Sequence, residues 1–458
     1  MKIPQHLIEK YNQPVPRYTS YPPATSFSAD FTPEQAARAY TASNTEKPGN
    51  ISLYFHIPFC TRLCHYCGCN TYFTRNRDLY GRYVEALGRE IVMISSQLAN
   101  ERQVTQVHFG GGTPNALPVE MIAQIMDMVK ENFSLSEKAE TAIECHPALL
   151  DERYLTSLHK AGFNRISLGI QDFDPDVLKT VNRDAPVIPV DELTRIIRSL
   201  GNIGLNFDFM YGLPGQTEAS FARTLEKAVS ISPDRLVTFS YAHVPWIKKA
   251  QKILEKKGLP DPSAKLDMFL TGYRIMKEAG YLPIGLDHYA RPDDELSVAL
   301  QNRTLHRNFQ GYCTRETTGQ VYAAGITGIS QLESAYIQNT RNMEFYLDQV
   351  SKRVFPVEKG YALSGNEKVI RHVITEIMCN NYLSWELASR ELGLPEDEIK
   401  SLVSCNEHIL EEFAADGLLR FTPEEVELTE TGRFFIRNIA AAFDPGFRTT
   451  AGAFSKAI

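Results

Sequence analysis

Four cysteines lie within ten residues of one another, and their spacing carries more chemical information than any other part of the chain. Cys60, Cys64, Cys67 and Cys69 follow the pattern C-x3-C-x2-C-x-C. Thiols this close together form disulfides, bind zinc or hold an iron–sulfur cluster. A loop with three ligands leaves one iron of a 4Fe-4S cluster open to a substrate or cofactor. Zinc prefers two ligand pairs separated by a longer loop, although Cys69 and His65 offer the remaining ligands of a tight zinc site.

The composition argues against the disulfide alternative. The chain has 458 residues, enough for a large core, but only 8 cysteines, and half of them are in this one run. Secreted disulfide scaffolds are smaller and distribute their cysteines, so we expect a reducing, cytoplasmic location. The formal net charge of −7 argues against a general binder of nucleic acid or acidic membranes. The first residues lack the apolar stretch of a signal peptide, and no run of about 18 apolar residues predicts a membrane span.

Short β-rich runs alternate with helical patterns from residue 51 onward. The predicted strands are Ile51–His56, Gln106–Phe109, Thr141–Cys145, Arg165–Gly169, Leu205–Tyr211 and Arg235–Tyr241. The predicted helices are Tyr80–Leu98, Pro118–Asn132, Leu150–Ala161, Asp191–Gly201 and Glu218–Ile231. This alternation is typical of a parallel sheet with crossover helices, either an open or partial barrel or a doubly wound sheet. In each case the reactive edge lies at the carboxyl ends of the strands, and the cysteine run follows the first strand at that edge.

The two ends of the chain differ from this central part, which we place at residues 50–350. Residues 1–49 are rich in Pro, Tyr, Ser and Thr and predict an arm with short helices. Residues 351–458 predict a mainly helical, winged-helix-like domain. Its predicted elements are helices Glu367–Cys379, Trp385–Leu392, Glu396–Glu412 and Glu430–Phe443 and a hairpin over Leu418–Leu428. The region has no strong basic stripe, so we favour a structural or lid role over DNA binding.

Several motifs recur together in one enzyme family. The C-x3-C-x2-C run, with Tyr66 before its third cysteine, resembles the signature of radical S-adenosylmethionine (radical SAM) enzymes. The chain as a whole is similar to the oxygen-independent coproporphyrinogen III oxidase (dehydrogenase) family of heme biosynthesis. The motifs that carry this resemblance are Pro16–Pro22, Cys67–Cys69, Gly110–Pro114, Asp208 with Tyr211–Pro214, Tyr241–His243, Asp287–Leu296 and Leu305–Tyr312. The arm motif and the two late motifs are the specific ones, because the cysteine run alone indicates only the superfamily.

The resemblance implies a fold and a set of cofactors. The expected fold is α/β: a partial (β/α)6 TIM-type barrel with an N-terminal arm that contributes to the active site and the helical C-terminal domain. Cys60, Cys64 and Cys67 match the cluster ligands, and S-adenosylmethionine would chelate the fourth iron, with two such molecules bound per chain. Cys69 matches a cysteine that is not a ligand in the family, so its role stays open between a buried thiol and a supporting group.

The resemblance also assigns residues to S-adenosylmethionine. Gly111, Gly112 and Thr113 follow a predicted strand, where glycines let the backbone approach a ligand closely. A carboxylate at a strand end is otherwise often a helix cap or an ion-pair partner. Arg183 suits a carboxylate because its guanidinium binds in a bidentate manner. The remaining positions that match are Tyr54, Tyr66, Glu144, Gln171, Asp208, Ala242 and Ile329.

The implied substrate, coproporphyrinogen III, carries four propionates, and buried carboxylates need cationic partners. The candidate residues are Arg17, Tyr18, Arg291, His306 and Arg307. Any single arginine is more often a surface charge, but three lie inside the specific motifs. His243 and His288 fit satisfied core histidines as well as site residues. His146 departs from the acidic residue that is common in the family at that position.

The implied reaction is an anaerobic oxidative decarboxylation. One electron from an external donor cleaves S-adenosylmethionine, and the resulting 5′-deoxyadenosyl radical removes a hydrogen atom from the β-carbon of a propionate. Loss of CO2 and of one electron to an acceptor leaves a vinyl group, and two such events give protoporphyrinogen IX. The alternatives are a heme-binding or heme-delivery protein on the same scaffold, a radical methyltransferase that modifies heme and a zinc-stabilised winged-helix regulator. We expect a monomer, since no coiled coil or interface stripe is apparent in the sequence.

Overall fold

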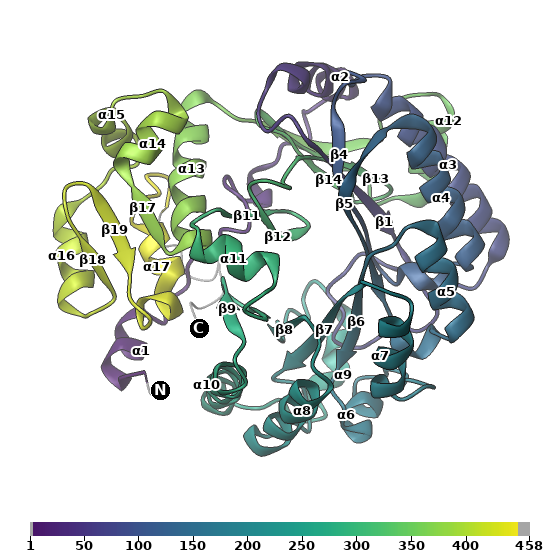
Figure 1. Cartoon of the computed structure of the whole chain (residues 1–458), viewed down its shortest axis with the longest axis horizontal. Coiled ribbons are helices and arrows are strands. Elements are labelled where there is room, and N and C mark those ends of the chain that lie inside the picture. The colour runs from purple at the N-terminus through teal and green to yellow at the C-terminus, as the bar shows by residue number, and fades with distance from the viewer. Residues whose placement is uncertain (1–2, 448–458) are drawn as a thin grey trace.

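The computed structural model describes residues 3–447, and at its centre is a twelve-stranded sheet (Figure 1). Six neighbouring strands run parallel in sequence order, and each is connected to the next by a crossover that contains helix. They are β1 (Ile51–Ile57), β4 (Gln103–Gly111), β5 (Ser134–Cys145), β6 (Arg165–Gln171), β7 (Gly204–Tyr211) and β8 (Arg235–Ser240). Each contains or overlaps a predicted strand, so the partial (β/α)6 barrel is confirmed.

Amphipathic helices cover the outer face of these strands (Figure 1). They are α3 (Arg77–Ser95), α4 (Val119–Asn132), α5 (Glu152–Ala161), α6 (Pro175–Thr180), α7 (Val190–Ser199), α8 (Glu218–Ile231) and α10 (Pro262–Glu278). In α4 the buried residues Ile122, Ile125, Met126 and Val129 recur at helical spacing on one face. Thr217 closes the amino end of α8 with a capping box, which explains why that helix begins at the predicted residue.

The sheet continues beyond the six predicted strands at both edges. On one side β13 (Gln320–Ala324) pairs parallel to β1, and β14 (Ile329–Gln331), β15 (Ala335–Asn339) and β16 (Val357–Ala362) follow antiparallel. On the other side β10 (His288–Ala290) and β9 (Leu282–Ile284) follow β8 antiparallel. Most of these strands have three to five residues, too few to show a clear period-two pattern. β16 belongs to this sheet although it lies beyond residue 350.

Shorter elements complete the central part of the chain. A separate hairpin of β11 (Leu305–Asn308) and β12 (Gly311–Thr314), preceded by α11 (Glu295–Gln301), lies between the barrel and the C-terminal part (Figure 1). The remaining elements are β2 (Phe59–Cys60), β3 (Tyr72–Phe73), α9 (Lys252–Glu255) and α12 (Met343–Ser351).

The C-terminal part is mainly helical, as predicted, but two helix bounds differ from the prediction. It contains α13 (Gly365–Asn380), β17 (Tyr382–Ser384), α14 (Trp385–Leu392), β18 (Leu419–Phe421) and β19 (Glu425–Leu428). The predicted helix Glu396–Glu412 is two helices, α15 (Glu396–Leu402) and α16 (Glu407–Ala415), because Ser404 adopts a positive φ and Asn406 caps the second helix. The last predicted helix is a 3-10 turn over Gly432–Phe435 followed by α17 (Ile436–Ala441).

The N-terminal arm joins both larger parts of the chain. It contains α1 (Gln5–Tyr11) and α2 (Pro33–Ala42). Arg437 of α17 donates a hydrogen bond to the carbonyl of Pro16 at 3.0 Å. Tyr18 and Tyr21 donate to the carboxylate of Asp444 at 3.0 and 3.1 Å. The arm residues 16–21 are thus attached to the C-terminal part by buried polar contacts.

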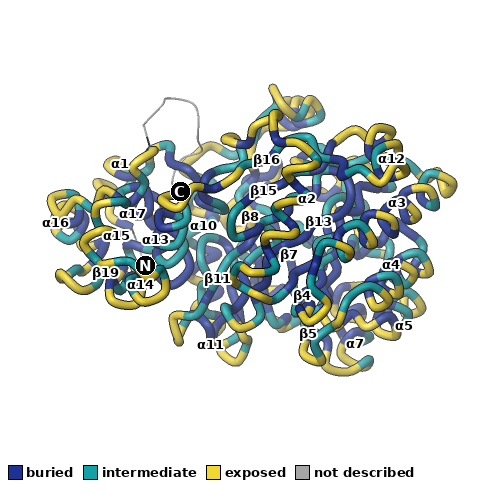
Figure 2. Tube along the Cα trace, turned by 90° about the horizontal axis from the view of Figure 1, so that it is seen from above, coloured by how far each residue is buried: buried dark blue, intermediate teal, exposed yellow. Residues whose placement is uncertain are grey.

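Large aromatic side chains fill the space between the sheet and its helices. Phe55, Phe109, Phe207 and Phe209 are all nearly inaccessible to solvent, and the buried strands run through the interior in Figure 2. Within residues 3–447 no helix combines the length and the apolar character needed to cross a membrane.

Candidate active site

A cavity of about 460 Å³ runs from the cysteine loop, residues 60–69, into the interior of the barrel. It reaches Arg165 and Arg235, the first residues of β6 and β8. Most of the predicted metal and cofactor residues line it, and they come from five strands and the loops that follow them. These residues are Cys60, Cys64, Tyr66, Cys67, Gly111, Gly112, Thr113, Glu144, Gln171, Arg183 and Asp208.

The cysteine loop holds four free thiols, three of them the predicted cluster ligands, and all four cysteines line the cavity. Cys60 ends β2, and its Sγ lies 3.3 Å from the hydroxyl oxygen of Thr113. Burial raises the pKa of Cys60 to about 11. A hydrogen bond from Cys69, opposed by burial but aided by the charges of Lys248 and Arg183, lowers the pKa of Cys67 to about 6. Cys69 therefore acts on Cys67, which supports a role as a neighbour of the ligands.

Arg183 joins the cysteine loop to strand β6. Its Nη1 donates to the hydroxyl of Tyr66 at 3.1 Å and lies 3.5 Å from Sγ of Cys64. Its Nη2 donates to the carbonyl of Gly169. The guanidinium thus places a fixed positive charge beside the thiols, where anionic ligands would need it.

The glycine segment after β4 packs against the chain that leads into the cysteine loop. Gly111 has a φ of +113°, and a Cβ there would lie 2.7 Å from ring atoms of His56. A Cβ on Gly112 would lie 2.6 Å from the carbonyl oxygen of Pro58. A side chain at either position would push away the strand end that carries Cys60.

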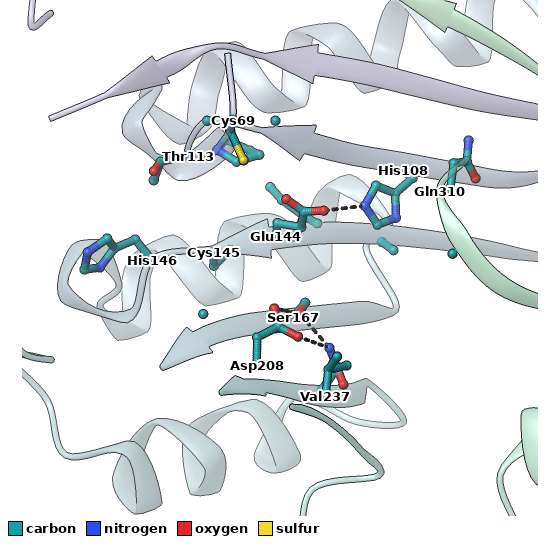
Figure 3. Close-up of a pocket in the computed structure, with 18 of the residues that line it drawn as sticks. Cys69, His108, Thr113, Glu144, Cys145, His146, Ser167, Asp208, Val237 and Gln310 are labelled. Carbon is teal, nitrogen blue, oxygen red and sulfur yellow. Dashed lines mark hydrogen bonds and ion pairs between the residues drawn. The ribbon is translucent and has the colours of Figure 1, made fainter. Parts of the chain in front are cut away.

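Glu144, at the end of β5, is paired with a histidine that the sequence did not single out. His108 of β4 lies with its Nε2 3.0 Å from Oε1 of Glu144 (Figure 3), and its ring stacks on Tyr54 at 5.9 Å. Burial opposes ionisation of Glu144, but the hydrogen bond with His108 holds the pKa of the carboxyl below its ordinary value. The pKa of His108 is raised, because the hydrogen bond and the charge of Glu144 outweigh the lowering effect of burial. An ion pair therefore faces the cavity.

Asp208, on β7, has no cation in hydrogen-bond contact among residues 3–447. Its carboxylate accepts hydrogen bonds from Ser167 of β6 and Asn206 of β7, both at 2.8 Å, and Figure 3 shows it below Glu144. Burial raises the pKa of Asp208 to about 6, despite these hydrogen bonds. This carboxylate is therefore the one in the cavity that most needs a cationic or hydrogen-bonding ligand.

Unsatisfied polar atoms indicate that the cavity accommodates a polar ligand. Three residues that line the cavity each have a buried polar side-chain atom without a hydrogen-bond partner among the described residues. These atoms are Oε1 of Gln171, Oδ1 of Asn206 and Nε2 of Gln310. Buried polar atoms nearly always have a partner. Three free thiols, a fixed arginine and unsatisfied amide groups together fit an iron–sulfur cluster with a polar cofactor beside it.

A second group of charged residues borders the cavity where the β11–β12 hairpin meets β10. The group, called here the arginine cluster, consists of Arg17, Asp287, His288, Arg307 and Tyr312. Nη1 of Arg307 donates to the hydroxyl of Tyr312 at 3.0 Å, and its buried Nε has no partner among the described residues. Nη2 of Arg17 lies 3.7 Å from Asp287, whose other oxygen lies 2.7 Å from Nδ1 of His288.

The charges of this cluster act strongly on its carboxylate. Burial would raise the pKa of Asp287, but His288, Arg307 and Arg17 lower it to about 2. Tyr312 and His288 line the cavity themselves. Arg307 contacts it through Tyr312, over whose ring its guanidinium lies at 4.7 Å.

Several predicted residues lie away from the cavity wall. Tyr18 is bonded to Asp444, as described above. Arg291 faces solvent and lies 3.6 Å from Asp293. His306 is buried near Arg315, and burial with that charge lowers its pKa to about 3. Ile329 packs with aromatic residues of the arm and β15.

Ala242 is exposed at the rim of the site. Its carbonyl accepts a hydrogen bond from Nε2 of Gln251 at 3.2 Å. Gln251 also donates to the carbonyl of Tyr66 at 3.0 Å, so Ala242 lies close to the cysteine loop although it does not line the cavity.

The sequence interpretation missed His108, Ser167, Asn206 and Gln310. Two of these residues could have been inferred, because side chains two positions apart in a strand lie on the same face. Asn206 stands two residues before Asp208, and Ser167 stands two residues before Gly169. His146 stands where the family commonly has an acidic residue. Its Nδ1 caps the turn after β5, and its side chain lines the cavity.

The parallel barrel and the loop with its C-x3-C-x2-C cysteines place the chain in the radical SAM class of enzymes. The sequence model of the Radical SAM superfamily matches residues 54–228. The chain belongs to the oxygen-independent coproporphyrinogen III oxidase family within it, because it is similar over nearly its whole length to enzymes of that name. It is 40% identical over 439 residues to the one from Synechocystis sp. (96% of this chain, 94% of the relative) and 39% identical over 445 residues to the one from Escherichia coli K12 (97% and 96%).

A solved structure agrees with this assignment. The coproporphyrinogen III oxidase (HemN) from Escherichia coli, described as a radical SAM enzyme, superposes with a TM-score of 0.89 at 36% sequence identity. The match covers 98% of this chain and 100% of that chain. The fold class expected from the motifs, including the arm and the C-terminal part, is thereby confirmed.

Proposed function

We propose that the chain is an oxygen-independent coproporphyrinogen III dehydrogenase, an oxidoreductase of heme biosynthesis. It converts two propionates of coproporphyrinogen III to vinyl groups and yields protoporphyrinogen IX. The observation that supports the proposal is the cavity, which extends from the cysteine loop to His288 and Tyr312 of the arginine cluster in a chain similar throughout to enzymes of this name. The heme-delivery alternative finds no support among these relatives.

Cys60, Cys64 and Cys67 would hold a 4Fe-4S cluster. Tyr54, Tyr66, Gly111, Gly112, Thr113, Glu144, Gln171, Arg183, Asp208, Ala242 and Ile329 would bind S-adenosylmethionine, two molecules per chain. When bound, these groups supply the one-electron chemistry that removes a hydrogen atom from the substrate. Arg183 orients a carboxylate, and Asp208 and Gln171 accept hydrogen bonds from the ligand.

The arginine cluster would bind propionates. Arg307 has an unsatisfied Nε, and Arg17 is half-exposed and lies 3.7 Å from Asp287, so each would have capacity to bind a propionate. Asp287 keeps both cations in place before the substrate arrives. Arg291 is paired with Asp293, and burial together with the charge of Arg315 keeps His306 neutral, so neither is assigned a propionate. The macrocycle would lie against aromatic side chains such as Tyr312.

The wider context of the proposal concerns the whole protein. We infer a cytoplasmic monomer that receives electrons from one donor and passes the surplus to one acceptor. Residues 1–49 would contribute Arg17 to the active site, residues 50–350 the radical chemistry, and residues 351–458 a cover that fixes the arm through Arg437.

The decisive experiment is anaerobic turnover. Protein with reconstituted cluster, dithionite and S-adenosylmethionine should convert coproporphyrinogen III and release two CO2 per product. A control with S-adenosylmethionine omitted should give no CO2. If the protein binds heme tightly and forms no product while the Escherichia coli enzyme does under the same conditions, the proposal is wrong.

A further inference from the structure

Large apolar side chains are exposed beside the cysteine loop. Trp246 is 73% exposed and Ile247 67% exposed, and they follow β8 at the cysteine-loop edge of the barrel. The other tryptophan, Trp385, is only 2% exposed. Leu63, inside the cysteine loop, is also exposed. Exposed aromatic and aliphatic groups that gather in one place mark a binding surface.

The same stretch of chain is strongly basic. The lysine segment, defined here as residues 246–257, contains five lysines and a single acidic residue, although the whole chain has a net charge of −7. Its carboxylate, Glu255, is paired with His243 at 2.9 Å. None of the five lysines takes part in an ion pair within residues 3–447, so their charge is available to a partner. These lysines are Lys248, Lys249, Lys252, Lys256 and Lys257.

Hydrogen bonds fix the lysine segment to the cysteine loop. Nζ of Lys248 donates to the carbonyl of Cys69 at 2.8 Å, and buried Gln251 donates to the carbonyl of Tyr66 at 3.0 Å. Lys248 acts electrostatically on Cys67. Two exposed arginines, Arg75 and Arg77, follow the loop in the chain, and both they and Cys60 act electrostatically on Tyr80. The positive charge of the lysine segment therefore reaches the cysteine loop directly.

We propose that this surface, centred on Trp246, Lys249 and Lys252, docks a small acidic protein that carries one electron at a time to the cysteine loop. The inference rests on the proposed function, which requires an electron at a cluster held by Cys60, Cys64 and Cys67. The carrier loses one electron and the cluster gains it, and no bond forms or breaks. Basic side chains draw an acidic carrier into position, and the exposed Trp246 anchors it.

A second copy of this chain fits the surface less well. Two copies that met here would bring two lysine segments together, and like charges oppose such contact. An acidic carrier meets complementary charge instead. Electrostatic attraction guides its approach, and salt reduces the range of that attraction.

The test uses full-length protein with reconstituted cluster and two purified probes, an acidic flavodoxin and an acidic ferredoxin, each chemically reduced. Stopped-flow absorbance follows bleaching of the cluster, and titration calorimetry measures carrier binding. The variants are Lys249→Glu with Lys252→Glu, and Trp246→Ala. The matched control is Lys138→Glu with Lys160→Glu, two exposed lysines near the opposite edge of the barrel. Lys248 stays unchanged because it contacts Cys69.

We expect at least one carrier to reduce the wild-type cluster. The lysine reversals should then slow reduction by roughly tenfold or more at low salt, with a smaller effect at high salt. Trp246→Ala should weaken carrier binding by about tenfold. The control reversals should stay within about twofold of wild type, as expected where charges lie far from the contact. Turnover driven by dithionite, which needs no docking, should be the same in all variants.

Three results would overturn the proposal: neither carrier reduces the wild type, the lysine reversals and the control slow reduction equally, or the wild type forms a dimer that Trp246→Ala abolishes. Failure of dithionite-driven turnover in the wild type is a different result. It would refute the proposed function and leave the binding and bleaching data as a separate measurement of the surface.

Discussion

The cysteine loop and the arginine cluster both border the cavity, but they are built in different ways. The loop is ten consecutive residues, 60–69, placed by the end of β1 and tied down by Arg183. The cluster combines Arg17 of the arm with residues from three strands, β10, β11 and β12, and a loop more than 250 positions later in the chain. The loop therefore depends on local geometry, whereas the cluster depends on how the arm, the barrel and the hairpin pack together.

Both regions gather cations, but around different groups. The loop gathers cations around thiols that must ionise to bind a metal. A hydrogen bond from Cys69, aided by the charges of Lys248 and Arg183, lowers the pKa of Cys67 to about 6. The cluster gathers cations around one carboxylate, Asp287, and leaves Arg307 with an unsatisfied nitrogen. The loop is thus suited to hold a metal cluster, and the arginine cluster to attract a further carboxylate. Substitutions in the two regions should have different effects.

The largest expected effect comes from breaking the loop. Cys64→Ala removes one of three proposed cluster ligands, so iron content and turnover should both fall to background. Iron and sulfide assays together with CO2 release measure the result. Cys405→Ala, a free cysteine in the C-terminal part, is the matched control and should keep both. Full iron content in the Cys64 variant would contradict the ligand assignment.

Breaking the arginine cluster should spare the metal but weaken the substrate interaction. Arg307→Ala should lower kcat/KM for coproporphyrinogen III by about ten- to a hundredfold, since a charged hydrogen bond contributes ~1.5–3 kcal/mol. Cluster absorbance should be unchanged. Steady-state kinetics measures the effect.

The control for that variant is the neighbouring residue on the same strand. His306 is buried against the C-terminal part, away from the cavity. His306→Ala should leave kcat/KM within a few-fold of wild type, and any change it causes should appear in stability. Equal losses in both variants would show that the hairpin merely needs to be intact.

This pair of residues also shows what the sequence alone could not reveal. His306 and Arg307 belong to the same motif, and both were predicted to bind substrate. Alternation along β11 sends them to opposite faces, and only the packing of α13 against that strand determines which face meets the cavity. Arg291 is a similar case, because its motif also contains Asp294, which accepts a hydrogen bond from Arg235 at 2.9 Å and so has a structural role.

The loop and the six parallel strands were predictable because their signals are local. Cysteine spacing, strand–helix alternation and helix caps each extend over a few residues. The edge strands β9, β10 and β13–β16 were not predicted, because each depends on pairing with a neighbour distant in sequence. The His108–Glu144 pair was missed for the same reason: its two members lie on adjacent strands, 36 residues apart.

A smaller effect is expected at the junction between thiols and cofactor. Arg183→Ala should weaken binding of S-adenosylmethionine by roughly tenfold, as expected for loss of one charged partner, while the protein keeps its iron. Equilibrium binding and absorbance at the same protein concentration separate the two properties. Arg62→Ala, which removes an exposed arginine paired with Asp184 in the same region, is the control and should bind normally. Loss of iron in the Arg183 variant would place this residue among the supports of the cluster.

The smallest effect compares two buried carboxylates. Asp287 has three cationic neighbours and a pKa of about 2, whereas Asp208 has two neutral donors and a pKa of about 6. The folded-state pKa of Asp208 lies above its ordinary value of 3.8, so its contribution to stability is fully present below that value. The contribution is lost as pH rises through 6, because the folded protein must then hold an unpaired charge.

Asp208→Asn should therefore stabilise the ligand-free protein, and more so at higher pH. The gain in the free energy of unfolding should be about 1 kcal/mol larger at pH 7.5 than at pH 5, since most of the ionisation of Asp208 in the folded state occurs between these values. Urea denaturation at both pH values measures it. Asp127→Asn, on the exposed face of α4, should show no such pH dependence. A gain that is equal at both pH values would mean that the amide merely packs better and that Asp208 is not held in the cavity as a strained carboxylate waiting for a ligand.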